Sequence, residues 1–101
     1  MEDLIPSEFY ISQNSPNPFK DSTKIKYCLP IKSKVKLVIY NSDNKKVKKL
    51  VSKVQEAGTY EIKLDSRDLL EDYYYYEMKA IGLPLGLKKV FNEMKRMMLV
   101  K

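Results

Sequence analysis

Strict alternation of apolar and polar side chains is the feature that most constrains this chain. In Thr23–Leu29 the residues Ile25, Tyr27 and Leu29 are separated by Lys or Cys, and residues 34–40 repeat the pattern. A period of two places alternate side chains on opposite faces of a β-strand, whereas a helix mixes them. These runs therefore predict strands with one buried and one solvated face.

Shorter runs of the same kind recur along the sequence. We expect strands at residues 9–11, 47–54, 60–64 and 73–80, the last with Tyr74, Tyr76, Met78 and Ala80 towards the core. The segment 47–54 fits neither period cleanly, which suggests a bulge or an edge. Turn signals separate the runs at roughly 8 to 12 residues. The pattern predicts an all-β fold, an antiparallel β-sandwich of about seven strands in two sheets with Greek-key connections.

The turn expected at 41–44 consists of Asn, Ser, Asp and Asn, whose side chains compete for backbone hydrogen bonds. Asn tolerates a left-handed backbone better than most residues do. We therefore expect Asn44 to take a positive φ.

A proline-rich corner interrupts the alternation between the first two expected strands. Each proline fixes its own φ and restricts the residue before it, so the corner is stiff and cannot be helical. Asparagine side chains stabilise turns by bonding nearby backbone. We interpret the corner as a structural clamp in which asparagines hold turns and an aromatic ring closes one end of the core. Its residues are Asn14, Pro16, Asn17, Pro18 and Phe19.

The corner also carries a resemblance to a known family. The run Ser12-Gln13-Asn14-x-Pro16-Asn17-Pro18-Phe19, followed by Ser22-Thr23-x-Ile25-x-Tyr27-x-Leu29-Pro30, resembles the opening of the C-terminal sorting domain carried by cargo of the type IX (Por) secretion system. It is also similar to the related immunoglobulin-like domain of flagellar hook-capping proteins. The likeness covers nearly the whole chain and implies an immunoglobulin-like sandwich over residues 8–101. Residues 1–7 are expected to be a linker or a disordered end.

The resemblance implies a non-catalytic function in protein export. A domain of this kind targets an exported multidomain protein to the secretion machinery, and its partners are machinery proteins or neighbouring domains of the same polypeptide. The folded domain would present the strand edge at the end of the chain to the partner, with main-chain hydrogen bonds giving affinity and alternate side chains giving selectivity. The residues assigned to this contact are Lys95, Arg96, Met97, Met98, Leu99, Val100 and Lys101.

The location implied by the resemblance is the periplasm, the cell surface or the medium, as part of a longer precursor. The first residues lack the apolar stretch of a secretory signal peptide, and no transmembrane segment is expected.

Two other functions stay open from the sequence. The domain could be structural, as in hook-capping proteins or as a spacer in a surface enzyme. It could also bind carbohydrate weakly, because Tyr73 and Tyr75 are expected to point outward and exposed rings stack on sugars.

The segment 87–98 supports two structures. Leu87, Val90, Phe91, Met94 and Met98 fall at helical spacing, with charged residues between them. The alternative is a final strand over residues 96–100 with Met97 and Leu99 inward, which the resemblance implies and which we favour.

Few residues point to chemistry. The chain has no His, which removes the usual general base and a common metal ligand. Cys28 is the only cysteine and is expected to be a packing residue.

An acidic cluster at Asp65, Asp68, Glu71 and Asp72 could hold calcium, although its spacing matches no EF-hand and capping is the commoner use. We expect no enzyme activity, no cofactor and no metal.

The net charge of +6 arises from 19 basic and 13 acidic residues. The lysines are spread along the sequence rather than clustered in a known module, so we expect a solvated surface and no nucleic-acid partner.

Overall fold

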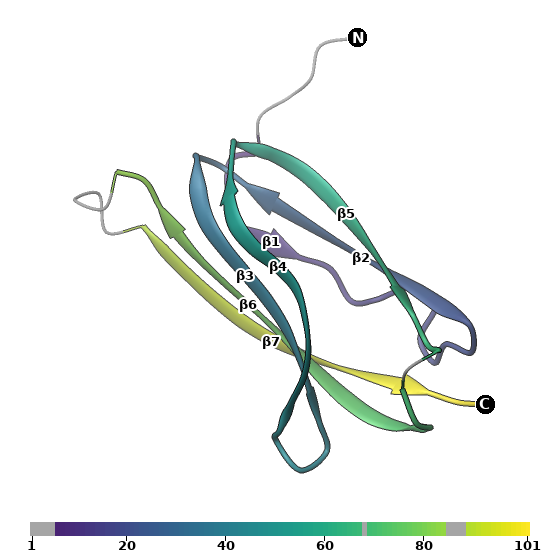
Figure 1. Cartoon of the computed structure of the whole chain (residues 1–101). Helices are drawn as coiled ribbons and strands as arrows, with labels where there is room; N and C mark the ends of the chain where they lie inside the picture. Colours follow the sequence, from purple (N-terminus) through teal and green to yellow (C-terminus); the bar gives the residue numbers. More distant parts are fainter. Residues whose placement is uncertain (1–5, 68, 85–88) are drawn as a thin grey trace, which may run out of the picture.

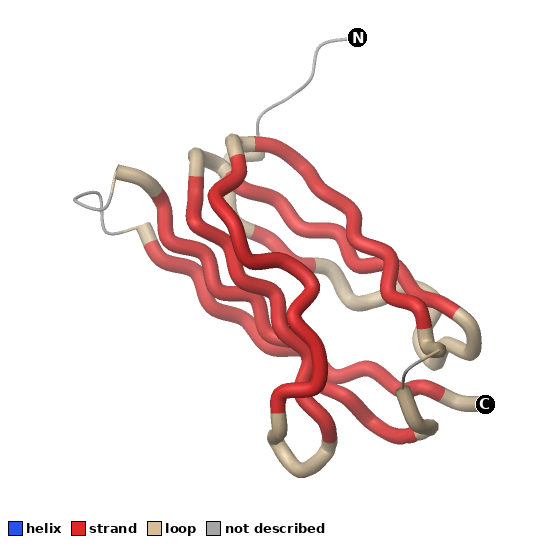
Figure 2. The backbone as a smooth tube through the Cα atoms, in the orientation of Figure 1, coloured by secondary structure: helices blue, strands red, loops and turns tan. Residues whose placement is uncertain are grey.

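Two antiparallel β-sheets packed face to face make up the structure (Figure 1). The computed structural model describes residues 6–67, 69–84 and 89–101. Its seven described strands are β1 (Tyr10–Ile11), β2 (Ser22–Leu29), β3 (Ser33–Asn41), β4 (Lys46–Gln55), β5 (Gly58–Asp65), β6 (Asp72–Gly82) and β7 (Val90–Leu99). Figure 2 shows strands and loops throughout, and the described residues contain no helix. Among them, accordingly, there is no helix that could span a membrane.

The strand order explains how the chain closes a core. One sheet has the order β1-β2-β5 and the other β4-β3-β6-β7. The chain passes between the sheets after β2, after β4 and after β5, so that β2 pairs with β5 and β3 pairs with β6 across intervening sequence. This is the Greek-key pattern of immunoglobulin-like sandwiches. The predicted all-β immunoglobulin-like fold is confirmed.

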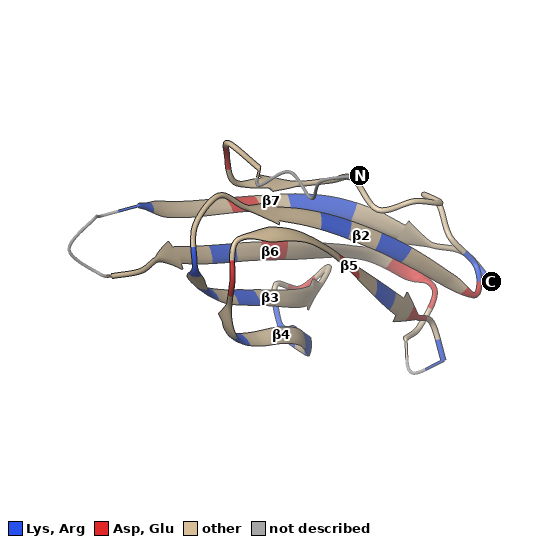
Figure 3. Cartoon of the chain, turned by 90° about the horizontal axis from the view of Figure 1, so that it is seen from above, with Lys and Arg blue, Asp and Glu red and all other residues tan. Residues whose placement is uncertain are grey.

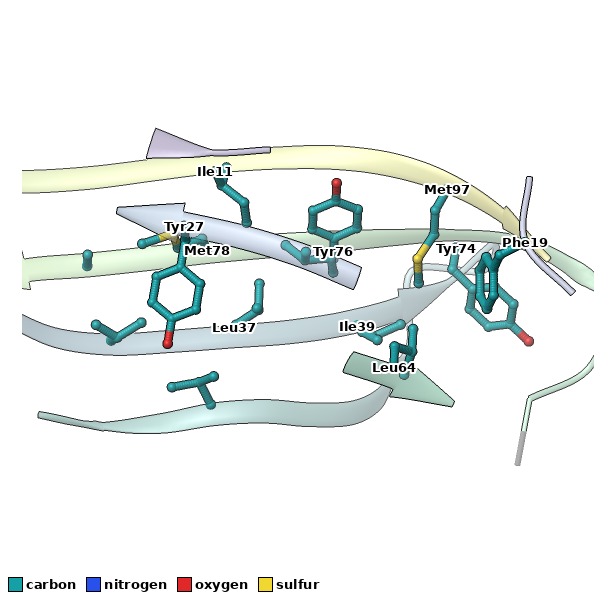
Figure 4. Close-up of a cluster of buried hydrophobic side chains, with 14 of the residues drawn as sticks. Ile11, Phe19, Tyr27, Leu37, Ile39, Leu64, Tyr74, Tyr76, Met78 and Met97 are labelled. Carbon is teal, nitrogen blue, oxygen red and sulfur yellow. The ribbon is translucent and has the colours of Figure 1, made fainter. Parts of the chain in front are cut away.

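The core consists of the side chains that the alternation placed inward. Ile25, Tyr27 and Leu29 from β2 face Val35, Leu37 and Ile39 from β3, and all are at most 1% exposed. Tyr74, Tyr76, Met78 and Ala80 from β6 and Met97 and Leu99 from β7 complete one wall, as Figure 4 shows in part. Hydrophobic burial of this kind dominates the stability of a sandwich.

The β3–β4 hairpin has the turn expected from its asparagines. Asn44 adopts a φ of 63°. The side-chain oxygen of Asn41 accepts hydrogen bonds from the amides of Asp43 at 2.9 Å and Lys45 at 3.0 Å. These bonds hold the left-handed turn that Asn tolerates.

β4 is the edge strand that its broken periodicity predicted. Its register against β3 shifts between Leu37 and Val38 and again between Ile39 and Tyr40, as expected of bulges. Val51 is the core residue of this strand, at 5% exposure.

The helical alternative for residues 87–98 is wrong over the described residues 89–98. β7 is antiparallel to β6 over ten pairs, from Ile81 opposite Val90 to Asp72 opposite Leu99. The strand therefore begins earlier than the expected residue 96. Residues 90, 94 and 98 lie four apart and so satisfy a period of two as well as a helical one, which is why the sequence was ambiguous. Leu87 lies outside the described residues.

Candidate functional site

The end of β7 is bound on its outer edge by the proline corner. The amide of Phe19 donates to the carbonyl of Met98 at 3.0 Å, and the amide of Val100 donates to the carbonyl of Phe19 at 2.9 Å. The side-chain oxygen of Asn17 accepts the amide of Met98 at 3.0 Å. Phe19 thus forms a parallel bridge with Leu99, and the corner covers this part of the strand edge.

Further contacts extend this pairing towards the beginning of β7. Gln13 donates from Nε2 to the carbonyl of Arg96 at 2.7 Å. The rings of Phe9 and Phe91 stack with centroids 5.6 Å apart. The segment from Phe9 to Phe19 therefore follows β7 in the same direction and contacts it at intervals along its length.

Inside the corner, the side chain of Asn14 is fully engaged. Its amide nitrogen donates to the carbonyl of Pro16 and to the hydroxyl of Thr23, both at 3.1 Å. Thr23 in turn donates to the carbonyl of Pro16 at 2.8 Å. Asn14 thus holds the local turn, whereas the side chain of Asn17 bonds to β7. The peptide bonds preceding Pro16 and Pro18 are cis.

A buried tyrosine hydroxyl joins the corner to the four-stranded sheet. The hydroxyl of Tyr76 accepts the amide of Asn14 at 2.8 Å and donates to the carbonyl of Ser12 at 2.7 Å. Burial raises the pKa of Tyr76 to about 12, because the interior disfavours the phenolate; the bond from Asn14 acts in the opposite direction, and the carboxylate of Glu93 adds to the rise. The sequence placed this ring in the core but gave no sign of its partners.

The terminal segment 95–101 presents only some of its side chains. Met97 and Leu99 lie in the core at 1% and 0% exposure. Arg96 and Lys101 are exposed, whereas Lys95, Met98 and Val100 are half-buried. The amide of Lys101 donates to Glu71 at 2.6 Å.

The outward tyrosines lie on the outer surface of the four-stranded sheet. Tyr73 is 42% exposed and Tyr75 is half-buried. The guanidinium of Arg96 lies 5.0 Å from the ring centroid of Tyr73, within the range of a cation–π interaction. In the register, Tyr75 lies opposite both Arg96 and Tyr40. Arg96 and Tyr40 are thus the immediate neighbours of the tyrosine pair on this surface.

The described carboxylates of the acidic cluster at residues 65–72 accept hydrogen bonds from different donors. Asp65 accepts the amide of Arg67 at 2.8 Å, and this bond is the main reason why the pKa of Asp65 is lowered. Asp72 accepts the hydroxyl of Ser42 at 3.0 Å, and Glu71 accepts the amide of Lys101. Asp68 lies outside the described residues. No group of acidic, His or Cys side chains in the described part of the chain is placed to hold a metal.

Cys28 lies half-buried on β2, and its sulfur is 3.6 Å from the hydroxyl of Thr59. The sequence contains no His, the residue that most often activates a nucleophilic thiol.

The sequence matches a known family over most of its length. Residues 15–90 match the family described as the secretion system C-terminal sorting domain, which is well over half of the chain. The matched range includes every residue of the proline corner except Asn14 and ends where β7 begins, so the terminal segment lies beyond it. No curated protein matches the sequence.

Proposed function

The chain belongs to the C-terminal sorting domains of the type IX secretion system, and from this membership we propose that it is a non-catalytic module that targets an exported multidomain protein to the secretion machinery. The family match over residues 15–90 carries the proposal. The fold supports it, because the sandwich closes around its own core and leaves its surfaces for recognition.

We assign the machinery contact to the terminal segment 95–101, as the resemblance implies. While the domain is folded, a partner has access to Arg96 and Lys101 and to parts of Lys95, Met98 and Val100. The recognised feature is then a set of side chains on a strand edge whose backbone groups around Met98 already have hydrogen-bond partners.

The sequence led us to expect recognition of the folded domain through this strand edge, with main-chain hydrogen bonds giving affinity and alternate side chains giving selectivity. At the end of β7 the outward amides of Met98 and Val100 and the carbonyls of Arg96 and Met98 already bind the corner. A partner strand could reach these groups only by displacing residues 13–19, at the cost of those bonds. Recognition of the folded domain through side chains avoids that cost.

The partners in this proposal are proteins of the secretion machinery, with neighbouring domains of the same polypeptide as the other contacts. The destination of the precursor is the periplasm, the cell surface or the medium.

The test is export of a reporter protein fused in front of this chain, in cells that carry the type IX machinery. We expect the reporter in the medium or at the cell surface with the intact domain, and inside the cells when residues 95–101 are deleted. Because the deletion also removes Met97 and Leu99 from the core, it can act by unfolding the domain.

A second variant separates recognition from folding. Arg96→Glu combined with Lys101→Glu changes two exposed side chains and leaves the core intact, and we expect export to fall severalfold. Lys26→Glu combined with Lys63→Glu on the other sheet is the matched control and should export normally. Normal export of the truncated fusion would contradict the proposal.

A further inference from the structure

The outward surface of the four-stranded sheet is rich in positive charge. We call this surface, formed by the outward side chains of β3, β4, β6 and β7, the outer face. Its cations alternate with core residues along the strands, and Figure 3 shows those of β3, β6 and β7. They are Lys34, Lys36, Lys46, Lys49, Lys79 and Arg96.

Little negative charge balances these cations. Among the described residues, Glu77 is the carboxylate of the outer face, and it already has partners. The hydroxyl of Tyr40 lies 3.4 Å from it and the ammonium of Lys79 lies 3.9 Å from it. Lys36 lies directly opposite Lys79 in the register, an arrangement in which like charges repel.

The basic residues also enclose a shallow hollow. Lys34, Lys36, Lys79 and Ile81 line a depression of about 170 Å³. Nothing acidic lines it, so it suits a carboxylate supplied from outside.

The opposite surface of the sandwich is balanced by comparison. On the outward side of β2 and β5, the ammonium of Lys24 lies 3.6 Å from Glu61, and Lys26 is opposite the same glutamate. Lys63 and Asp65 follow on that side of β5. The excess of positive charge is therefore larger on the outer face, where the six cations share the carboxylate of Glu77, than on the opposite surface, where three lysines share two carboxylates.

Exposed apolar side chains accompany the charge on the outer face. Val90 is 66% exposed and Met94 49%, and Tyr73 and Ile81 are also exposed. Protein interfaces are enriched in Tyr, Met and Arg, with hot spots most often at Tyr, Trp and Arg. A partner that offers only phosphate or sulfate charge would leave these apolar groups in water.

The size of the outer face suits a protein partner. Four strands spaced about 4.8 Å apart and about ten residues long, at about 3.3 Å per residue, span roughly 600 Å² in projection. A stable interface covers about 800 Å² of accessible surface on each partner, and a face studded with side chains exposes more than its projection.

We propose that the outer face docks an acidic protein surface, with acidic side chains meeting Lys34, Lys36 and Lys79 and apolar side chains meeting Met94 and Val90. This rests on the proposed function and deepens it, because it specifies that the receptor in the export machinery presents an acidic surface with apolar side chains. The face is continuous with the terminal segment through Arg96 and Met98, so one receptor can cover both.

The test compares two charge-reversed versions of the full chain in the reporter-export assay. The outer-face variant combines three substitutions, Lys34→Glu, Lys36→Glu and Lys79→Glu. The control variant makes the same change in net charge on the opposite face, with Lys24→Glu, Lys26→Glu and Lys63→Glu. Circular dichroism and thermal unfolding establish that both are folded. If the first variant does not fold, the corresponding Gln substitutions replace it.

We expect export to fall about tenfold with the outer-face variant and to be unaffected in the control. Equal export of the two variants, whether normal or reduced, overturns the inference while the proposed function stands. If the intact domain itself fails to export the reporter, the proposed function is wrong and the inference falls with it.

A photo-crosslinking residue in place of the exposed Asn92 identifies the class of partner in exporting cells. We expect an adduct that proteinase digests and that the outer-face variant no longer forms. An adduct that carries a glycan instead of a protein would overturn the assignment to an acidic protein surface.

Discussion

At the scale of single residues, Tyr76 shows how one polar group connects distant segments. Its ring lies fully in the core, and its hydroxyl reaches the backbone on either side of Gln13. The bond from the amide of Asn14 is buried and the bond to the carbonyl of Ser12 is partly buried, so both backbone groups gain a partner from this hydroxyl where water has restricted access. The side chain therefore contributes packing and hydrogen bonding together.

Replacing Tyr76 with Phe keeps the ring and removes the hydroxyl. The amide of Asn14 and the carbonyl of Ser12 then lose a partner, and we expect the free energy of unfolding to fall by about 1–3 kcal/mol. Urea denaturation measures the change. Tyr75→Phe, on the outer face, is the control and should shift stability by less than about 0.5 kcal/mol. Equal effects of the two substitutions would show that the hydroxyl of Tyr76 does not contribute to the free energy of unfolding.

At the scale of elements, β7 is held from two sides. β6 pairs with it along its whole length, and the proline corner covers the outer edge of its last residues. Edge strands are a risk for aggregation, and a covered edge reduces that risk. The corner thus protects the strand to which we assign the machinery contact.

Asn17→Ala tests this protection. The substitution removes the acceptor for the amide of Met98 and leaves the core unchanged, so we expect that amide to exchange faster with solvent. The loss of global stability should be about 1 kcal/mol. Hydrogen exchange followed by nuclear magnetic resonance measures both. Asn92→Ala, an exposed asparagine on the same strand, is the control; unchanged exchange at Met98 in Asn17→Ala would contradict the proposed role of the corner.

At the scale of the whole molecule, buried tyrosines couple stability to alkaline pH. Burial is the leading cause of the raised pKa values of Tyr27, Tyr74 and Tyr76. In the unfolded chain the pKa of each phenol is near the ordinary value of 10.0, whereas burial in the fold raises the pKa of Tyr76 to about 12. The contribution of Tyr76 to stability is therefore complete below pH 10 and is lost as the pH rises towards 12, and the raised pKa values of Tyr27 and Tyr74 act in the same direction.

We expect these tyrosines to leave the free energy of unfolding nearly constant between neutral pH and pH 10. Above pH 10 the free energy of unfolding should decline. Denaturation at a series of pH values, together with tyrosinate absorbance, tests this. In Tyr76→Phe the decline should be shallower, because one of the responsible groups is gone. An equally steep decline would exclude Tyr76 as a contributor.

The sequence by itself determined the strands and their inward faces. Alternation in β2, β3 and β6 predicted that Ile25, Leu37 and Met78 lie in the core. Alternate side chains of a strand point to opposite faces, so when every second residue is apolar, the apolar face is the one that packs inward. The run at residues 90–98 was harder because side chains four apart satisfy both strand and helix periods. Pairing of β7 with β6 decided between them.

Only the tertiary structure decided which segments meet. No local pattern connects Asn17 with Met98 or Tyr76 with Asn14, because hydrogen bonds between residues more than sixty positions apart depend on how the sheets close. The charge of the outer face is similar: each strand shows its own lysines, but strand order alone brings Lys36 opposite Lys79. Local periodicity fixes the face of a side chain, and its neighbours on that face are set by topology.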